Sequence, residues 1–468
     1  MCRHAATKRT AMTALLLAGG IHLSAQAQNA EVACEPLQLN HRQPNPSASA
    51  DDLYGYAVAT NGKYTVVGSK QEDQGAHNAG VLYKYNTHTG ELQLTIRNPF
   101  PGYADHFGDR LEYLGHNILS GVHYNDRHAL NTGAVYLFGG TTGRLLQDYY
   151  SPTPDEGDLF GFAIAPVGDR RVLIGAHRDD TKSEDSGAAY FYDAYSGDHL
   201  QSFFHPSGES HARFGISMTW LGGGRVAIGS HYDDSVADNG GAVYIFDVNT
   251  GNLLSTLTSP NPTDQGKFGW DVTTVGGNLL VGAFNDDTGQ GNTGAAYLYS
   301  ASGNLIRTIE SPLAQDDARF GFSLSPMGRD LLIGAPGVGD NQQGAAYLFD
   351  GATGELIKSF SSPNSASRWF GYDVSSSGAH NITIGAPRDS TQGSNAGYSF
   401  VYGDCGEIHG SVWLDDSNDG IRNHVEDGYG KVEINLSGTD VNGNPLSARA
   451  WTGNDGFYHF RNLPAGDY

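Results

Sequence analysis

The stretch of sequence that decides the fold runs from Phe160 to Pro206 and reads F-G-F-A-I-A-P-V-G-D-R-R-V-L-I-G-A-H-R-D-D-T-K-S-E-D-S-G-A-A-Y-F-Y-D-A-Y-S-G-D-H-L-Q-S-F-F-H-P. It contains four short runs rich in Val, Ile, Tyr and Phe, at Phe162–Pro166, Val172–Ala176, Ala188–Tyr192 and Leu200–Phe204. Turn residues separate the runs, and this pattern is typical of neighbouring strands in an antiparallel sheet. The stretch therefore predicts a unit of four strands, which needs copies of itself as neighbours because it cannot bury both faces alone.

Copies of this unit recur along the chain with a period of 50 to 54 residues. Each copy opens with an aromatic-Gly pair, at Tyr54-Gly55, Phe107-Gly108, Phe160-Gly161, Phe214-Gly215, Phe268-Gly269, Phe320-Gly321 and Phe370-Gly371. A second Gly follows a β-branched run, at Gly68, Gly121, Gly175, Gly229, Gly282, Gly334 and Gly385. A third signature, Gly-x-x-aromatic, begins at Gly80, Gly133, Gly187, Gly241, Gly294, Gly344 and Gly397. Seven copies with this period predict an all-β fold, a seven-bladed β-propeller.

The two ends of the repeat region are incomplete in complementary ways. The seventh copy stops near Tyr402 without a fourth strand, and residues 36–43 resemble a fourth strand without the first three. We expect the N-terminal strand to complete the seventh blade, which removes exposed sheet edges. Cys34 lies just before this strand and Cys405 just after the third strand of blade seven, so a disulfide between them would fasten the closure. Two unpaired thiols are the alternative.

The N-terminus has the pattern of a secretory signal peptide. Basic residues precede the apolar run Ala11–Ile21, and Ala25-Gln26-Ala27 fits a cleavage site. The run is too short to span a bilayer, so we expect cleavage after Ala27 and a secreted or surface-displayed protein without membrane insertion. A membrane anchor is the alternative.

The chain is strongly acidic, with 51 Asp and Glu against 28 Lys and Arg among 468 residues. Removal of residues 1–27 would leave 25 basic residues and a net charge of −26. This charge disfavours nucleic acid and anionic membranes as partners, and it permits cations, basic proteins or neutral glycans.

Acidic residues gather in the loops between the second and third strands, which open on one face of a propeller. Pairs stand at Asp179-Asp180, Asp233-Asp234 and Asp286-Asp287. One interpretation is a rim that attracts cations or a basic partner. The other is that each Asp caps its own loop through hydrogen bonds to the backbone, which the repetition itself favours.

The aromatic-Gly pairs, together with Gly334-Ala335-Pro336 and Gly385-Ala386-Pro387, resemble the FG-GAP repeat family over about residues 46–402. That family includes the propeller heads of integrin alpha chains and many bacterial surface proteins. Integrin-like calcium blades carry an Asp-x-Asp-x-Asp-Gly loop between the two signatures. Here tight turns such as Val167-Gly168-Asp169 stand in its place, so we expect no calcium in the blades by that mechanism.

The composition changes after Cys405. Alternation at Val432, Ile434 and Leu436 predicts a strand. The segment Gly410-Ser411-Val412-Trp413 and the ending Gly456–Tyr468 resemble the serine-aspartate-repeat (Sdr) B-like domain, a prealbumin-like β-sandwich of bacterial surface proteins. The resemblance implies a further strand after Tyr468, so we expect this sequence to be a fragment. We therefore divide the chain into a signal peptide (1–27), a propeller (28–405) and a B-like domain (406–468).

A twelve-residue calcium-loop pattern, D-x-S-x-D-G-x5-E, begins at Asp415. On that template Ile421 supplies a carbonyl oxygen, Asn423 acts directly or through water, and the side-chain ligands are Asp415, Ser417, Asp419 and Glu426. Ser417 replaces the commoner Asp or Asn and should weaken the site. The resemblance to B-like domains also implies calcium, and an Asx-rich turn without an ion is the alternative.

No pairing of a nucleophile with a base is legible in the sequence. Three histidines, His123, His177 and His231, recur at one register, but seven-fold placement puts equivalent atoms far apart. We expect a binding or adhesion protein with an extracellular protein or glycan as partner, in which the propeller stands on a calcium-stiffened stalk. The alternative is an extracellular enzyme acting on glycans through the central pocket, which carboxylates converging on the axis would favour.

Overall fold

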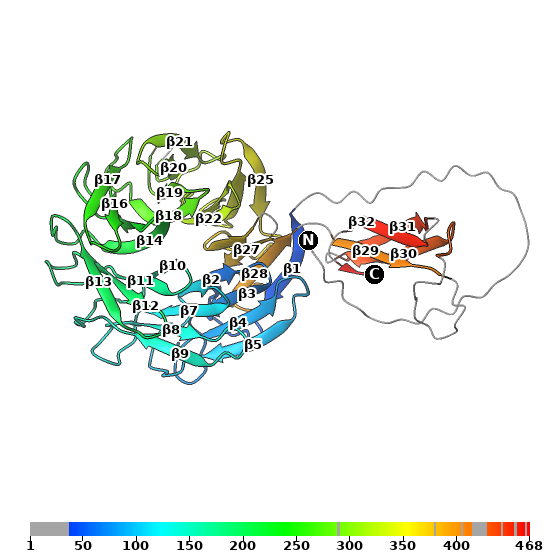
Figure 1. The fold of residues 1–468 in the computed structure, drawn as a ribbon, viewed down its shortest axis with the longest axis horizontal. Helices are drawn as coiled ribbons and strands as arrows, with labels where there is room; N and C mark the ends of the chain where they lie inside the picture. The colour runs from blue at the N-terminus through cyan, green and yellow to red at the C-terminus, as the bar shows by residue number, and fades with distance from the viewer. Residues whose placement is uncertain are drawn as a thin grey trace, which may run out of the picture. The chain divides into compact units, whose positions relative to one another are not determined.

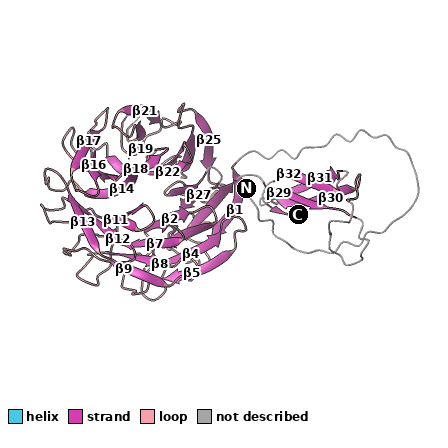
Figure 2. Cartoon of the chain, viewed as in Figure 1, coloured by secondary structure: helices cyan, strands magenta, loops and turns pink. Residues whose placement is uncertain are grey.

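The computed structural model describes residues 37–287, 291–378, 381–403, 406–413, 428–440, 443–453, 456–463 and 466–468. One compact unit runs from His41 to Tyr402, and a second includes the strands that follow Gly403. Both are built from strands and loops (Figure 2). Within the described ranges there is no helix of the length and apolarity needed to cross a membrane.

The first unit is a propeller of seven four-stranded sheets (Figure 1). Blade one consists of β2 (Tyr54–Thr60), β3 (Tyr64–Ser69), β4 (Val81–Asn86) and β5 (Leu92–Arg97). Blade two consists of β6 (Arg110–Leu114), β7 (Asn117–Val122), β8 (Ala134–Phe138) and β9 (Leu145–Tyr149). Blade three consists of β10 (Ala163–Val167), β11 (Arg171–Ala176), β12 (Ala188–Asp193) and β13 (His199–Phe204). Blade four consists of β14 (Phe214–Gly222), β15 (Arg225–Ser230), β16 (Ala242–Asp247) and β17 (Leu253–Thr258). Blade five consists of β18 (Phe268–Val275), β19 (Asn278–Ala283), β20 (Ala295–Tyr299) and β21 (Leu305–Glu310). Blade six consists of β22 (Ser323–Met327), β23 (Asp330–Ala335), β24 (Ala345–Phe349) and β25 (Leu356–Ser361). Blade seven consists of β26 (Val374–Ser377), β27 (Asn381–Ala386), β28 (Tyr398–Gly403) and β1 (Gln38–Pro44).

Each blade is an antiparallel meander whose register follows the repeat. In blade three, Ala163 pairs with Gly175, Gly175 with Ala189, and Ala189 with Phe203. The four strands expected between Phe162 and Phe204 all form, with bounds that shift by one residue at most. The prediction of an all-β, seven-bladed propeller is therefore confirmed.

The recurring glycines lie where the backbones of neighbouring blades touch. A Cβ on Gly175 would lie 2.0 Å from the carbonyl oxygen of Gly215 in the next blade, and a Cβ on Gly187 would lie 2.1 Å from that of Phe214. The backbone N–H of Phe214 also donates to the carbonyl oxygen of Ser186 at 2.9 Å. Only glycine permits this approach, so the signatures of the repeat encode contacts between blades.

The aromatic residues that open the repeats fill the space between blades. Phe160 is fully buried and packs in one apolar cluster with Leu137 of the preceding blade and Tyr190 of its own blade. Burial of one such ring contributes roughly 1.5–3 kcal/mol to stability. The core is therefore a series of aromatic layers between adjacent sheets.

Blade seven is assembled from both ends of the unit, in the order β1-β28-β27-β26. The hydroxyl of Ser399 donates to Oε1 of Gln43 at 3.0 Å, and Nδ2 of Asn45 donates to the carbonyl oxygen of Ala396 at 3.3 Å. A Cβ on Gly397 would lie 2.0 Å from the carbonyl oxygen of Tyr54, so blade seven meets blade one as other neighbours meet. The N-terminal strand closes the disc, as the sequence predicts. Cys34 and Cys405 lie outside the described residues, and their disulfide stays a prediction.

The second unit contains two small sheets. β29 (Gly406–Ser411) pairs with β32 (Phe457–Leu463), and β30 (Glu433–Asp440) lies between β31 (Pro445–Trp451) and β33 (Gly466–Asp467). Phe460 and Leu463 are buried. Along β30, exposed and half-buried residues alternate, which agrees with the predicted strand around Ile434. The predicted calcium ligands between Asp415 and Glu426 lie outside the described residues.

Candidate binding site on the propeller axis

A pocket of about 400 Å³ lies on the axis of the propeller, and residues of the first strand of every blade line it. The first strand is one edge of each sheet, and these edges surround the pocket, so the first strands are innermost. Successive side chains of a strand point to opposite faces, so alternate positions of seven equivalent strands converge on one axis. Two positions of the repeat therefore supply the charged side chains of the lining and most of its serines and threonines.

These two positions lie two and four residues after the first Gly of each repeat. The nearer position carries Ala57, Arg110, Ala163, Ser217, Asp271, Ser323 and Asp373. The farther position carries Ala59, Glu112, Ala165, Thr219, Thr273, Ser325 and Ser375. Most blades thus supply a methyl or hydroxyl group, and charged groups come from blades two, five and seven alone.

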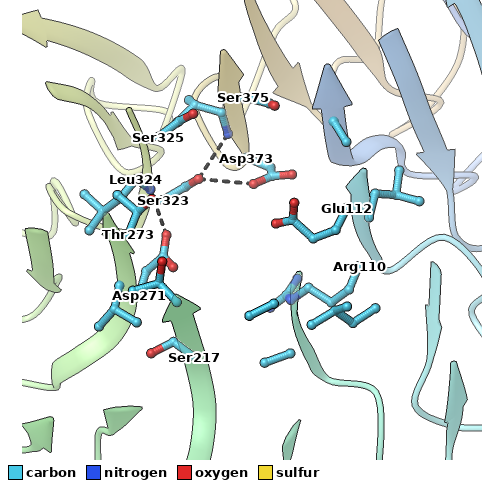
Figure 3. A pocket seen from close by; sticks show the side chains of 18 of the residues that line it. Arg110, Glu112, Ser217, Asp271, Thr273, Ser323, Leu324, Ser325, Asp373 and Ser375 are labelled. Atoms are coloured by element: carbon cyan, nitrogen blue, oxygen red, sulfur yellow. Dashed lines mark hydrogen bonds between the residues drawn. The ribbon is translucent and has the colours of Figure 1, made fainter. Parts of the chain in front are cut away.

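Three carboxylates and one guanidinium face the pocket. Figure 3 shows Glu112 of β6 and the neighbouring Asp373 extending toward each other, with Arg110 beside Glu112 and Asp271 across the pocket. The axial carboxylates do not bring their oxygens within 4.8 Å of one another as a group of three. The site is therefore wider than the coordination sphere of a single small ion.

Burial makes these acids weaker. Burial, with repulsion from Asp373 and Asp271, raises the pKa of Glu112 to about 8. Burial also raises the pKa of Asp271 to about 7 and that of Asp373 to about 6. The surface of Glu112 is exposed to solvent, however, which screens part of this effect. The carboxyl groups of the pocket therefore keep their protons to a higher pH than free carboxyl groups do.

Two of the carboxylates also join neighbouring blades. Oδ2 of Asp373 accepts the backbone N–H of Val58 at 2.6 Å, and Oδ1 accepts the hydroxyl of Ser323 at 3.1 Å. Oδ2 of Asp271 accepts the backbone N–H of Leu324 at 2.7 Å. Glu112 makes no such bridge to another blade among the described residues, so the disc does not need its charge.

Aromatic rings surround one end of the pocket. Tyr56 and Tyr372 lie 4.7 Å apart between ring centroids and share a hydrogen bond of 2.6 Å between their hydroxyls. Phe322 lies 4.9 Å from Tyr372 and 5.2 Å from Trp270. These four rings line the pocket and offer apolar faces beside its carboxylates.

The three histidines at one register do not form a metal site. The ring of Phe162 stands beside both His123 and His177, with centroid distances of 5.1 and 4.3 Å. His231 packs against Trp270 at 5.2 Å. Burial lowers the pKa of all three imidazoles. They pack against aromatic rings as neutral groups, and Nε2 of His123 also lies 3.1 Å from Oδ2 of the buried Asp109.

The predicted acidic rim divides into two kinds of residue. The first Asp of each pair, Asp179, Asp233 or Asp286, is buried. Each accepts the hydroxyl of a tyrosine in the third strand: Tyr190 at 2.5 Å, Tyr244, and Tyr297 at 2.6 Å. These carboxylates therefore hold their own loops, as the capping interpretation expects.

The second Asp of each pair, Asp180, Asp234 or Asp287, is exposed. Each accepts the backbone N–H of the residue five positions later, at 2.5 to 2.7 Å. That residue has a positive φ of 51° to 53°, a conformation that Asn and Asp adopt more readily than other side chains. Both Asp residues thus have a place in the loop, and a partner-binding role for the three exposed ones stays a prediction.

One group of His and carboxylate side chains, within the part of the chain that the structure describes, has ligand atoms within 4.8 Å of one another. It consists of His205, Glu209 and Asp233, which are close enough to hold a metal ion. Burial alone would raise the pKa of Asp233, but hydrogen bonds from His205, Ser235 and Tyr244 hold it at about 2. Each member of the group is engaged in hydrogen bonds, so the cluster is complete without an ion.

Together the fold and the axial pocket define a repeat propeller joined to a small β-sandwich. Residues 154–192 and 253–299 match the FG-GAP repeat, and residues 406–468 match the SdrD B-like domain. The chain therefore carries an FG-GAP propeller followed by an SdrD B-like domain, as its motifs predict. These domains are typical of extracellular and cell-surface proteins of the adhesion and structural kind. No curated protein matches the chain.

Proposed function

We propose that the chain is a secreted or cell-surface binding protein whose propeller is the interaction module and whose B-like domain is a calcium-stiffened stalk. The observation that carries this proposal is the charge in the axial pocket. Blade three closes its part of the ring with Ala163 and Ala165, so the fold does not require Arg110 and Glu112 at the same positions of blade two. Side chains that a fold does not require are candidates for binding.

The partner that fits this face is an extracellular protein or glycan. Aromatic rings and hydroxyl groups line the pocket with the carboxylates, which suits both sugar rings and polar side chains. The net charge of −23 disfavours nucleic acid.

Three features of the sequence support export and the stalk. The pattern of residues 1–27 directs secretion, the Cys34–Cys405 pair suits an oxidising compartment, and the loop from Asp415 to Glu426 suits extracellular calcium.

Glycan and extracellular-protein arrays, probed in calcium and in chelator, test the proposal. We expect the wild-type chain to bind a restricted set of ligands and the pocket variant Glu112→Lys to lose them. A matched rim variant, with Asp180, Asp234 and Asp287 changed to Asn, should retain them. Loss in the rim variant alone would move the site to the rim, and absence of any ligand would contradict the proposal.

One observation favours glycan cleavage as a second candidate. A protonated Glu112 facing an ionised Asp373 is the pairing of acid and base that glycoside hydrolysis uses. Release of reducing ends from a bound glycan, lost in Glu112→Gln, would support this function. Binding without release would leave the propeller a binding module.

A further inference from the structure

The connection that enters blade four differs from its six counterparts. At the residue before the Pro of each connection, the other blades carry Asn45, Asn98, Ser151, Ser259, Ser311 and Ser362. The fourth carries His205, followed by Pro206 and the exposed Ser207. An imidazole is thus present where the repeat otherwise places a small capping side chain.

One side of this imidazole is held by a buried carboxylate. Nε2 of His205 lies 2.8 Å from Oδ2 of Asp233, and both side chains are at least 99% buried. Tyr244 donates its hydroxyl to the same carboxylate oxygen. Oδ1 of Asp233 accepts the backbone N–H of Ser235 at 2.9 Å. The carboxylate is therefore fixed in place and accepts a proton-bearing Nε2.

The other side of the imidazole faces a hydroxyl group. Nδ1 of His205 lies 3.1 Å from the hydroxyl oxygen of Ser207. The backbone N–H of Glu209 also points at Nδ1, at 3.3 Å, so Nδ1 must be the unprotonated nitrogen. The carboxylate and the backbone N–H thus select the same tautomer, in which the N–H of Glu209 and the hydroxyl of Ser207 share the lone pair of Nδ1.

We propose that Ser207, His205 and Asp233 form a nucleophilic triad that cleaves acyl esters presented at this exposed turn. Ser207 is the nucleophile, His205 is the general base through Nδ1, and Asp233 is the residue that positions the ring. The arrangement of roles is that of serine hydrolases, with the two ring nitrogens exchanged. Lys182 lies beside the turn, because a Cβ on Gly208 would lie 3.7 Å from the Cβ of Lys182, and its Nζ lies 5.0 Å from the centroid of the Phe204 ring.

The reaction needs only water as co-reactant. The oxygen of Ser207 bonds to the ester carbonyl carbon while its proton passes to Nδ1 of His205. The tetrahedral intermediate then breaks the bond to the alcohol oxygen, which leaves with that proton. Water, deprotonated by the same nitrogen, attacks the acyl-serine, releases a carboxylic acid and restores the hydroxyl.

The chain supplies its own control for a purely structural role. In the first connection, Oδ1 of Asn45 accepts the N–H of Ser47 at 3.0 Å, and its Nδ2 donates to Asp52 at 2.8 Å. The exposed Ser47 bonds directly to Glu72 and to Tyr83, with no imidazole between them. His205→Asn therefore places at this position the side chain that the first two connections carry, and it removes the base, but Ala212 stands where the first connection has Asp52.

The full chain is treated with a fluorophosphonate probe, and the labelled peptide is identified by mass spectrometry. Hydrolysis of p-nitrophenyl acetate is measured in parallel. We expect labelling at Ser207, its complete loss in Ser207→Ala, and a loss of about 10²-fold or more in His205→Asn, the usual contribution of a general base. Ser47→Ala should change neither readout. Thermal melting of each variant verifies the fold, and Ser207→Ala, on the surface, remains informative if His205→Asn is unstable.

Equal labelling of wild type and His205→Asn would overturn the triad and leave His205 a capping residue. Labelling at another serine, or no labelling, would also overturn it. Activity that requires added zinc or disappears in chelator would assign the cluster to a metal instead. The variants leave the axial pocket unchanged, so these outcomes are independent of the array experiment.

Discussion

Two regions of the blades can be compared position by position: the loops between the second and third strands, and the first strands. They differ in how many blades carry a charged residue at the same position of the repeat. In the loops, a buried carboxylate recurs four residues after the second Gly, at Glu72, Asp179, Asp233, Asp286 and Asp389. In the first strands, charge occurs in three blades, and the other four carry Ala, Ser or Thr. The loop carboxylates hold loops together, whereas the axial ones line an open pocket, where Asp271 and Asp373 also bond to neighbouring blades and Glu112 does not among the described residues.

This difference separates structural residues from binding residues in a repeat protein. A group present in nearly every copy meets a need that every copy has, such as a turn or a contact with the next blade. A group present in one or two copies answers no common need of the fold. Charges placed irregularly on a regular scaffold are therefore the better guide to function.

The strongest test of the repeated positions is the seam between blades seven and one. Gly397→Ala should lower the free energy of unfolding by about 3–5 kcal/mol, because its Cβ would lie 2.0 Å from the carbonyl oxygen of Tyr54. Gly157 is a matched control, since both glycines have a φ of 87° but a Cβ on Gly157 meets nothing within 4 Å. Gly157→Ala should cost about 1–2 kcal/mol, the cost of the left-handed backbone alone. Equal losses in urea denaturation would contradict the role given to the blade contact.

A smaller effect distinguishes the two Asp residues of one loop. Asp179→Ala should cost about 2–3 kcal/mol, because it leaves the buried Tyr190 hydroxyl and the N–H of Thr181 without their carboxylate. Asp180→Ala should cost about 1 kcal/mol, since its N–H partner reaches water. Thermal melting compares the two. A larger loss at Asp180 would reverse the assignment of the buried residue as the structural one.

Calcium binding to the predicted loop of the B-like domain should give a still smaller change in the free energy of unfolding. Calcium at tenfold its dissociation constant should stabilise the domain by about 1.4 kcal/mol, and Asp419→Ala should abolish the gain. Differential scanning calorimetry with calcium and with chelator measures it. A melting temperature unchanged by chelation would favour the Asx-rich turn.

The smallest expected effect concerns the axial acid that the fold does not need. Because the pKa of Glu112 is raised to about 8, its contribution to stability is complete below pH 4.5 and is lost as the pH rises toward 8. Glu112→Gln should therefore stabilise the propeller at pH 8.5 by about 1 kcal/mol, after screening by water in the pocket, and leave it unchanged near pH 4. Melting curves at both pH values check the sign, and destabilisation at pH 8.5 would show that the charge supports the fold.

The sequence predicts the architecture well because local rules determine it. The aromatic-Gly pairs mark contacts between blades, and the missing strands at the two ends define how the ring closes. The FG-GAP and B-like motifs identify both domains for the same reason, since each depends on residues close together in the chain.

The axial site was missed because its members are far apart in sequence. Glu112, Asp271 and Asp373 face one pocket only when the ring is closed, and the signal for them in the sequence is a charge two or four residues after the first Gly of a repeat. The first Asp of each pair accepts a hydrogen bond from a tyrosine eleven residues later in the chain, as Asp179 does from Tyr190. The proximity of His205 to Asp233, 28 residues apart, likewise requires the folded loop.

The closure of blade seven determines when folding of the propeller can be completed. Gln43 and Ser399 touch although 356 residues separate them, so a segment made early has no partner until almost the entire disc has been synthesised. Six sheets can assemble in order of synthesis, and the seventh must wait. Such a distant pairing is slow to form, and a chain cut short before β28 would keep an unsatisfied edge open to other chains. The seventh blade can therefore be completed only in a chain that contains both β1 and β28.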